Sequence, residues 1–127
     1  MHPLRLKLLP ERLAICRLEA SDRVPGWATA DGFLSVTRTA DELSIVCPER
    51  SVPAHVRQEP GWRAFQVEGP LPFSATGILA ALAVPLAAAG ISIFSVSTFD
   101  TDYVLVKDSD ASPAAAALYA SGHSVEL

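Results

Sequence analysis

Two segments of this sequence have residue types and spacing that suit ligand binding, and the first is residues 69–78, Gly-Pro-Leu-Pro-Phe-Ser-Ala-Thr-Gly-Ile. It leads from a predicted strand into the start of a predicted helix, where unpaired backbone N–H groups and the helix dipole attract a carboxylate or a phosphate. The prolines stiffen the approach, and Gly77 lets a ligand come close to the backbone. The alternative is an ordinary strand-to-helix connection in which Ser74 and Thr76 only cap the helix.

The second segment, residues 95–103, crowds small hydroxylated residues into a strand end and the turn that follows it. Hydroxyl groups in a β-rich core are costly unless they find hydrogen-bond partners, and a small polar ligand could supply them, as could cross-strand bonds or buried water. Asp102 is the one acidic residue that we place at the mouth of this hairpin. It either contributes to a ligand site or caps the turn.

No pattern typical of catalysis or metal binding accompanies these segments. His2, His55 and His123 lie far apart without a metal-ligand spacing, and the sequence contains no HExxH, CxxC, GxSxG, P-loop or GxGxxG motif. The acidic pair Asp41-Glu42 falls at a turn, where carboxylates usually face solvent. We therefore expect no catalytic residues, no cofactor and no metal.

Composition bounds the class of protein. The chain has 127 residues, half of them apolar, and a formal net charge of -4, enough for one compact domain or two very small ones. An acidic chain without a basic patch argues against nucleic-acid binding. The longest apolar stretch, residues 78–91, is too short for a membrane span and contains Pro85.

The remaining composition points to a protein of the cytoplasm. Charges interrupt the apolar run at the N-terminus, unlike a secretory signal, so we expect a cytoplasmic location. Cys16 and Cys47 both lie in alternating apolar segments. We expect two buried, reduced thiols, with a disulfide as the alternative.

The first half of the chain is expected to form strands and one short helix. Residues 13–18 are typical of a strand, and residues 33–47 of a β-hairpin with its turn at Asp41-Glu42. Ser51-Val52-Pro53 predicts a helix start, and Glu59-Pro60-Gly61 predicts its end.

The second half gives clearer signals. Residues 62–68 predict a strand, residues 77–89 a helix with Ile78, Leu82 and Leu86 on one face, and Gly90 its end. A hairpin of residues 91–99 and 102–107, a helix from Ser112-Pro113 to Gly122 and a last strand from His123 follow. The two hairpins start about half a chain apart, which predicts two small units that share a core.

Three stretches of the second half resemble known proteins: residues 70–79, residues 85–93 (Pro-Leu-Ala-Ala-Ala-Gly-Ile-Ser-Ile) and residues 97–106 (Ser-Thr-Phe-Asp-Thr-Asp-Tyr-Val-Leu-Val). They resemble small bacterial proteins with tandem ACT domains, and they are similar to the ligand-binding half of the eukaryotic cytosolic arginine sensors (the CASTOR proteins). The specific match covers about residues 62–107. The first 60 residues fit as a degenerate partner ACT unit.

The resemblance implies an α+β chain of two ferredoxin-like (βαββαβ) ACT units, with antiparallel sheets and helices on one face, divided into residues 1–61 and 62–127. It also implies an amino-acid ligand at the strand-to-helix loop, often across an interface between ACT units. By this resemblance, Asp102 would pair with the cationic group of the ligand, and the loop amides would bind its carboxylate. Where the arginine sensors carry a glutamate, this chain has Ala75. The expected ligand-binding residues are Pro72, Phe73, Ser74, Ala75, Thr76, Gly77, Ile78, Leu79, Thr98, Phe99 and Asp102.

The function expected is therefore that of a non-catalytic regulatory protein that binds a small amino acid and forms a homodimer. A regulated protein partner is possible, whereas nucleic acid and membrane are not expected as partners. One alternative is a protein-protein interaction module of ACT fold that has lost ligand binding. Another is an enzyme of unknown type, for which the sequence offers no motif.

Overall fold

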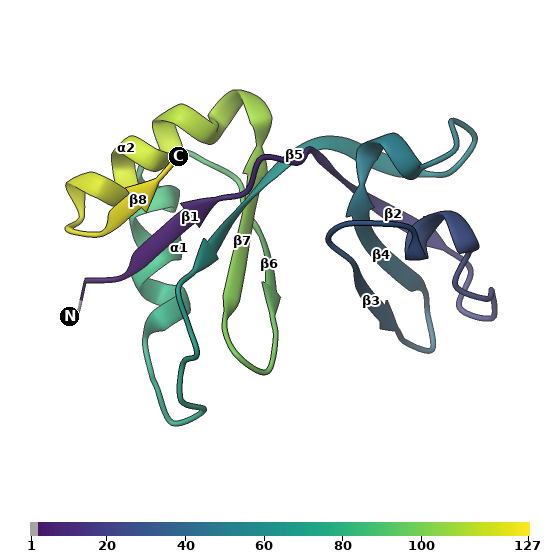
Figure 1. The fold of residues 1–127 in the computed structure, drawn as a ribbon, viewed down its shortest axis with the longest axis horizontal. Coiled ribbons are helices and arrows are strands. Elements are labelled where there is room, and N and C mark those ends of the chain that lie inside the picture. The colour runs from purple at the N-terminus through teal and green to yellow at the C-terminus, as the bar shows by residue number, and fades with distance from the viewer. Residues whose placement is uncertain (1–2) are drawn as a thin grey trace. The chain divides into compact units, whose positions relative to one another are not determined.

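The computed structural model describes residues 3–127, which form two compact units (Figure 1). The N-terminal unit is Glu11–Trp62, and the C-terminal unit combines the chain up to Pro10 with Arg63–Leu127. The predicted division at residues 61 and 62 assigned the start of the chain to the first unit. The structure instead groups that start with the second, because its strand pairs there: Leu6 lies opposite Val67, and Lys7 opposite Gln66.

The C-terminal unit is a sheet of strands with two α-helices. Its strand order is β6-β7-β5-β1-β8. The pairs β6–β7 and β1–β5 are antiparallel, whereas β1–β8 is parallel. The prediction of purely antiparallel sheets is therefore wrong at β8, because β1 lies between β5 and β8. The elements are β1 (Arg5–Leu8), β5 (Gln58–Val67, from Arg63 onward), α1 (Ile78–Ala88), β6 (Phe94–Ser97), β7 (Asp102–Lys107), α2 (Ala111–Ala120) and β8 (Ser124–Glu126).

Both helices of this unit pack on one apolar core. Leu82 and Leu86 of α1 are fully buried and Ile78 packs against the same cluster, which confirms the predicted face. Leu118 contributes from α2. Gly90 ends α1 with φ +73°, the left-handed conformation that glycine tolerates best.

One buried histidine connects three segments of this unit. His123 is 2% exposed. The backbone N–H of Leu4 donates to its Nδ1 at 3.0 Å, and its Nε2 lies 3.2 Å from the Ala81 carbonyl oxygen of α1. Since Nδ1 accepts, Nε2 carries the proton and donates to Ala81. His123 therefore has a structural role.

The N-terminal unit has the strand order β3-β4-β2-β5, with antiparallel pairing throughout. Its strands are β2 (Leu13–Leu18), β3 (Ser35–Arg38), β4 (Leu43–Pro48) and the part of β5 up to Trp62. Short 3₁₀ helices, η1 (Gly26–Thr29) and η2 (Glu49–Ser51), stand where the other unit has α1 and α2. The described hairpins β3–β4 and β6–β7 are both antiparallel, as predicted.

The predicted helix from Ser51 is wrong, and so is its predicted end. Residues 59–61 lie inside β5, at an irregularity where Leu13 pairs with Trp62 but Ile15 pairs with Glu59. Gly61 takes φ +81° there. Strand pairing with β2 thus outweighs the local helix-start signal.

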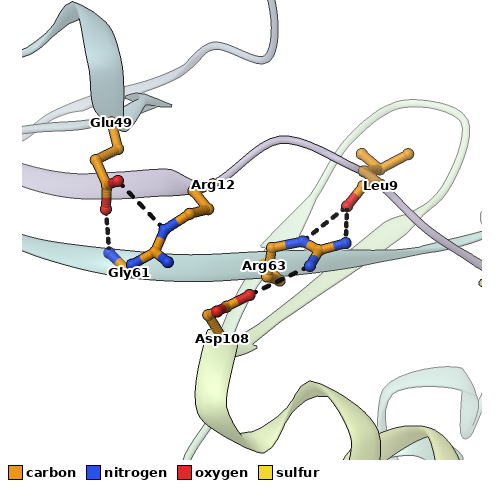
Figure 2. A network of polar contacts seen from close by, with 6 residues as sticks. All are labelled: Leu9, Arg12, Glu49, Gly61, Arg63 and Asp108. Atoms are coloured by element: carbon orange, nitrogen blue, oxygen red, sulfur yellow. Dashed lines mark hydrogen bonds and ion pairs between the residues drawn. The ribbon is translucent and has the colours of Figure 1, made fainter.

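The Glu49 side chain accepts a backbone hydrogen bond at this irregularity, as Figure 2 shows. Its Oε1 accepts the Gly61 N–H at 2.8 Å, and its Oε2 lies 3.2 Å from Nε of Arg12. The backbone donor that leaves the ladder therefore finds a carboxylate acceptor, which is what a strand irregularity needs.

Within the C-terminal unit, Arg63 holds the end of β1 in a similar way (Figure 2). Its Nε and Nη2 donate to the Leu9 carbonyl oxygen at 3.0 and 2.9 Å, and its Nη1 donates to Asp108 at 3.2 Å. Ala64 adds a backbone bond, since Leu9 N–H donates to its carbonyl at 2.8 Å. Arg63 thus fixes β1 beside β5.

Cys16 and Cys47 are buried and free, as predicted. Burial, with Cys47 close by, raises the pKa of Cys16 to about 12. Burial also raises the pKa of Cys47. Both thiols therefore stay protonated and behave as small apolar side chains of the core.

Among the described residues, no helix is long and apolar enough to cross a membrane.

Candidate functional site

A cavity of about 330 Å³ lies in the C-terminal unit, between the loop that enters α1 and the turn that joins β6 to β7. Both predicted ligand-binding segments contribute to it. Those predicted residues that line it are Pro72, Phe73, Ala75, Gly77, Ile78, Leu79, Thr98, Phe99 and Asp102. The structure therefore brings the two segments together around one space.

The loop side of the cavity presents the start of α1. Gly77 is the N-cap residue, with φ +77° and no side-chain cap hydrogen bond. The first intrahelical bond is donated by Ala81 to the Gly77 carbonyl, at 2.9 Å. The N–H groups of Ile78 and Leu79 come before that bond, and both residues line the cavity.

The prediction that Ser74 or Thr76 caps α1 is wrong, because neither side chain makes a cap hydrogen bond. These two are also the predicted ligand-binding residues that do not line the cavity. A turn comes first, in which Ala75 N–H donates to the Pro72 carbonyl at 2.9 Å, and the chain then enters the helix through the left-handed Gly77. The start of α1 consequently has no side-chain cap, and its first backbone N–H groups remain as hydrogen-bond donors.

The hairpin side of the cavity is ordered by hydroxyl groups. Thr101 is 6% exposed, and its hydroxyl donates to the Val67 carbonyl at 2.6 Å. Thr98 N–H donates to the Thr101 carbonyl at 2.8 Å. Leu71 N–H donates to the Asp100 carbonyl at 2.6 Å, which joins the loop to the turn. The turn therefore has a fixed position relative to β5 and the loop.

Asp102 begins β7 directly opposite Ser97, the last residue of β6. The Ser97 hydroxyl donates to its Oδ1 at 2.6 Å. Among the residues that the structure describes, Asp102 forms no ion pair. One carboxylate oxygen is thus oriented by serine, and no cationic side chain within residues 3–127 pairs with the charge.

A second acidic residue, Asp100, also lines the cavity. The expectation that Asp102 is the one acidic residue at the hairpin mouth is therefore wrong. In the part of the chain that the structure describes, no lysine, arginine or histidine lines the cavity, and residues 64–106 contain none. The electrostatic character of this space is acidic at the hairpin and, through the helix N-terminus, positive at the loop.

Two phenylalanines flank the cavity. Phe73 and Phe99 are each 78% exposed. Their ring centroids are 4.8 Å apart at an interplanar angle of 71°, an edge-to-face pair. This pair offers an apolar contact that joins the loop to the turn.

Sequence reasoning missed four lining residues: Leu71, Ser97, Asp100 and Thr101. All four belong to the two segments that the sequence indicates, Leu71 to residues 69–78 and the other three to residues 95–103. What the sequence does not predict is the contact of the Leu71 backbone with a turn that lies far along the chain.

Other features offer less for binding. A cavity of about 400 Å³ over β1, β5 and β8 is lined by charges of both signs, including the Arg5–Glu68 ion pair at 3.7 Å. Among residues 3–127, no group of three or more His, Cys, Asp or Glu side chains could hold a metal ion.

Comparison with known families matches an ACT domain model over residues 57–120. A second model, described as an N-terminal domain, matches residues 11–55. The second match lies within the N-terminal unit, and the ACT match covers most of the C-terminal unit together with residues 57–62 of the N-terminal unit.

Two solved structures are similar to nearly the whole chain. A protein from Agobacterium tumefaciens is 46% identical, with a TM-score of 0.94, over 100% of this chain and 95% of that one. The regulatory subunit of aspartate kinase from Thermus thermophilus, in its ligand-free form, is 12% identical over 88% of this chain and 93% of that one; its TM-score of 0.60 shows a shared fold.

The curated relatives include the cytosolic arginine sensor for mTORC1 subunit 1 from Homo sapiens, which is 48% identical over 48 residues. Those residues are 37% of this chain but only 15% of the human protein. The family model covers half of this chain, and the Agobacterium tumefaciens structure covers all of it. The mixed α+β, ferredoxin-like chain described here therefore belongs to the ACT domain family.

Proposed function

We propose that this chain is a regulatory protein that binds a free α-amino acid in the cavity between the α1 entry loop and the β6–β7 turn. The observation that carries the proposal is the pairing of two opposite binding devices in one space. The start of α1, which has no side-chain cap, lines it on one side, and two acidic residues, Asp100 and Asp102, line it on the other, with no lysine, arginine or histidine among the lining residues that the structure describes.

The helix N-terminus suits the carboxylate of the ligand. The N–H groups of Ile78 and Leu79 have no intrahelical acceptor, and the helix dipole adds a partial positive charge there. A bound carboxylate would satisfy these donors without any basic side chain. The absence of a capping side chain from Ser74 or Thr76 keeps the donors available.

The hairpin end suits the cationic group of the ligand. Ser97 holds Asp102 by one oxygen, so the carboxylate is oriented before the ligand arrives. Asp100 adds a second negative charge. Phe73 and Phe99 would contact the apolar part of the ligand and cover it from water.

Ala75 bears on which amino acid is bound. It lines the cavity at the position where the arginine sensors carry a glutamate. A buried cation needs full pairing, so the missing carboxylate lowers the preference for arginine. Asp100 partly replaces that charge, and Ala75→Glu should shift preference toward arginine or lysine.

Assembly and partners form part of the same proposal. We propose a homodimer, which would cover exposed apolar side chains such as Phe73, Phe99 and Val84. Light scattering should then give twice the 13.5 kDa chain mass at micromolar concentration. A regulated protein partner would read the ligand state, and the name of the cytosolic relative supports a cytoplasmic setting.

A thermal-shift screen against the twenty amino acids tests the proposal. A ligand that binds only the folded state raises the melting temperature, so at least one amino acid should stabilise the chain. No stabilisation by any of them at millimolar concentration would favour an interaction module of ACT fold that binds no amino acid.

Asp102→Asn is the matched variant for the amino acid that the screen selects. The amide keeps the shape and a hydrogen bond with Ser97 but removes the charge. If the pairing is desolvated, affinity should fall by about 2 kcal/mol, roughly 30-fold. Unchanged affinity would leave Asp102 with a turn-capping role.

A further inference from the structure

The two units share one turn in close detail. The hairpin of each unit turns through residues that begin with threonine, residues 39–42 and residues 98–101. Thr39 N–H donates to the Glu42 carbonyl at 2.9 Å, and Thr98 N–H donates to the Thr101 carbonyl at 2.8 Å. The two threonine hydroxyls also accept equivalent bonds, from Glu42 N–H at 3.2 Å and from Thr101 N–H at 3.3 Å.

This shared turn aligns the residues on either side of it. Arg38 pairs with Leu43 across one hairpin, and Ser97 pairs with Asp102 across the other. Arg38 therefore corresponds to Ser97, which lines the ligand cavity. Likewise, residues 19–25 between β2 and η1 correspond to the loop between β5 and α1.

In the N-terminal unit, the Arg38 side chain reaches from the turn to that loop. Its Nη1 donates to the Ala20 carbonyl, and its Nη2 donates to the Asp22 carbonyl at 2.7 Å. The loop carries an internal bond of its own, from Glu19 N–H to Asp22 Oδ2 at 3.0 Å. The Arg38 guanidinium thus donates to two carbonyl oxygens of a loop that has its own internal hydrogen bond.

A second correspondence concerns the turn carbonyl. The Asp100 carbonyl accepts the Leu71 N–H at 2.6 Å. At the equivalent position, the Asp41 carbonyl accepts Nη2 of Arg17 at 3.0 Å. In the C-terminal unit, a backbone hydrogen bond joins the loop to the turn. In the N-terminal unit, arginine guanidinium groups donate to the carbonyl oxygens of the loop and of the turn.

We infer that the N-terminal unit has a guanidinium-binding site at the position that corresponds to the amino-acid cavity, and that Arg38 of the same chain is its occupant. The planar guanidinium fork can donate to two carbonyls at once, which the point charge of lysine cannot reproduce. Because Arg38 occupies the site of the N-terminal unit, only the cavity of the C-terminal unit is open to an external ligand among these two corresponding sites. We therefore expect one amino acid bound per chain.

The test removes the occupant and supplies a substitute. Arg38→Ala should lower the melting temperature by about 4 °C, because the loop loses two hydrogen bonds. Methylguanidinium, on the order of 10 mM, should then recover at least half of that loss. Sodium chloride at the same concentration should not.

Two controls make the result specific. Wild-type protein is measured with the same probe, and any stabilisation that it gains from methylguanidinium in the acidic cavity is subtracted from the recovery of the variant. Arg5→Ala removes an arginine that is 79% exposed and makes one long ion pair, at 3.7 Å, and it should show no recovery. Arg38→Lys should be destabilised and recover less than the alanine variant, because its ammonium still occupies the space.

Equal melting temperatures for Arg38→Ala and wild type would overturn the inference, as would equal recovery for Arg38→Ala and Arg5→Ala. If Arg38→Ala does not fold, NMR of the wild-type protein tests instead whether Arg38 occupies the site. Separate, slowly exchanging guanidinium protons for Arg38 support an occupied site, and averaged ones contradict it. None of these readings uses an amino-acid ligand, so they stand even if the proposed function fails.

Discussion

Replacing Thr101 by valine should destabilise the C-terminal unit and loosen the cavity turn. The side chain is 6% exposed, and its hydroxyl donates to the Val67 carbonyl at 2.6 Å. Valine has nearly the same shape, so the change removes the hydrogen bond without opening a cavity. A buried bond of this kind contributes about 1–2 kcal/mol, because water cannot replace the lost donor.

The loss should lower the melting temperature by about 5 °C or more. Urea unfolding followed by circular dichroism measures the same loss as a lower midpoint at an unchanged slope. Thr37→Val is the matched control: Thr37 is exposed on β3, and no described residue bonds to its hydroxyl. If Thr101→Val were as stable as Thr37→Val, the account of how the turn is held in place would be wrong.

Two further predictions concern the N-terminal unit. The hydrogen bond from Arg50, at 2.6 Å, lowers the pKa of Glu11 below its ordinary value, and the Phe33 N–H adds to this. The folded pKa is thus below the unfolded one, so the stability from Glu11 is present above about pH 5 and is lost as pH falls through the lowered pKa. Glu11→Gln should therefore flatten the acid side of the unfolding profile, and parallel profiles for the two proteins would refute this. Because the thiols of Cys16 and Cys47 are buried with raised pKa values, iodoacetamide at pH 8 should alkylate neither in the folded chain and both in urea; rapid modification without urea would contradict their burial.

The parts of the fold that the sequence predicted well depend on neighbouring residues. The spacing of Ile78, Leu82 and Leu86 marks the buried face of α1, and Gly90 marks its end. Alternation and a polar turn mark both hairpins. These signals are local, so no knowledge of distant contacts was needed.

The parts that it did not predict depend on residues far apart in the chain. β1 has only four residues, and its place beside β5 comes from the pairing of Leu6 with Val67. The helix signal at Ser51 is overridden because β5 extends through Gly61, whose amide is accepted by Glu49.

The candidate site shows the same division. The two segments were recognisable from their glycine, proline and hydroxyl content, and the fold places them around one cavity. That Ser74 and Thr76 leave the helix uncapped follows from the left-handed Gly77. That Asp100 joins Asp102 follows from the turn bonded to Leu71.

The most direct test of amino-acid binding at this site is an NMR titration of the ¹⁵N-labelled chain with the amino acid that stabilises it most. A carboxylate at the start of α1 must perturb the backbone amides of Ile78 and Leu79, and a cation at the hairpin must perturb that of Asp102. We predict that these amides shift together and saturate with one affinity. Shifts confined to the sheet around Lys7 and Glu126, or no saturable shift at all, would contradict the proposed site.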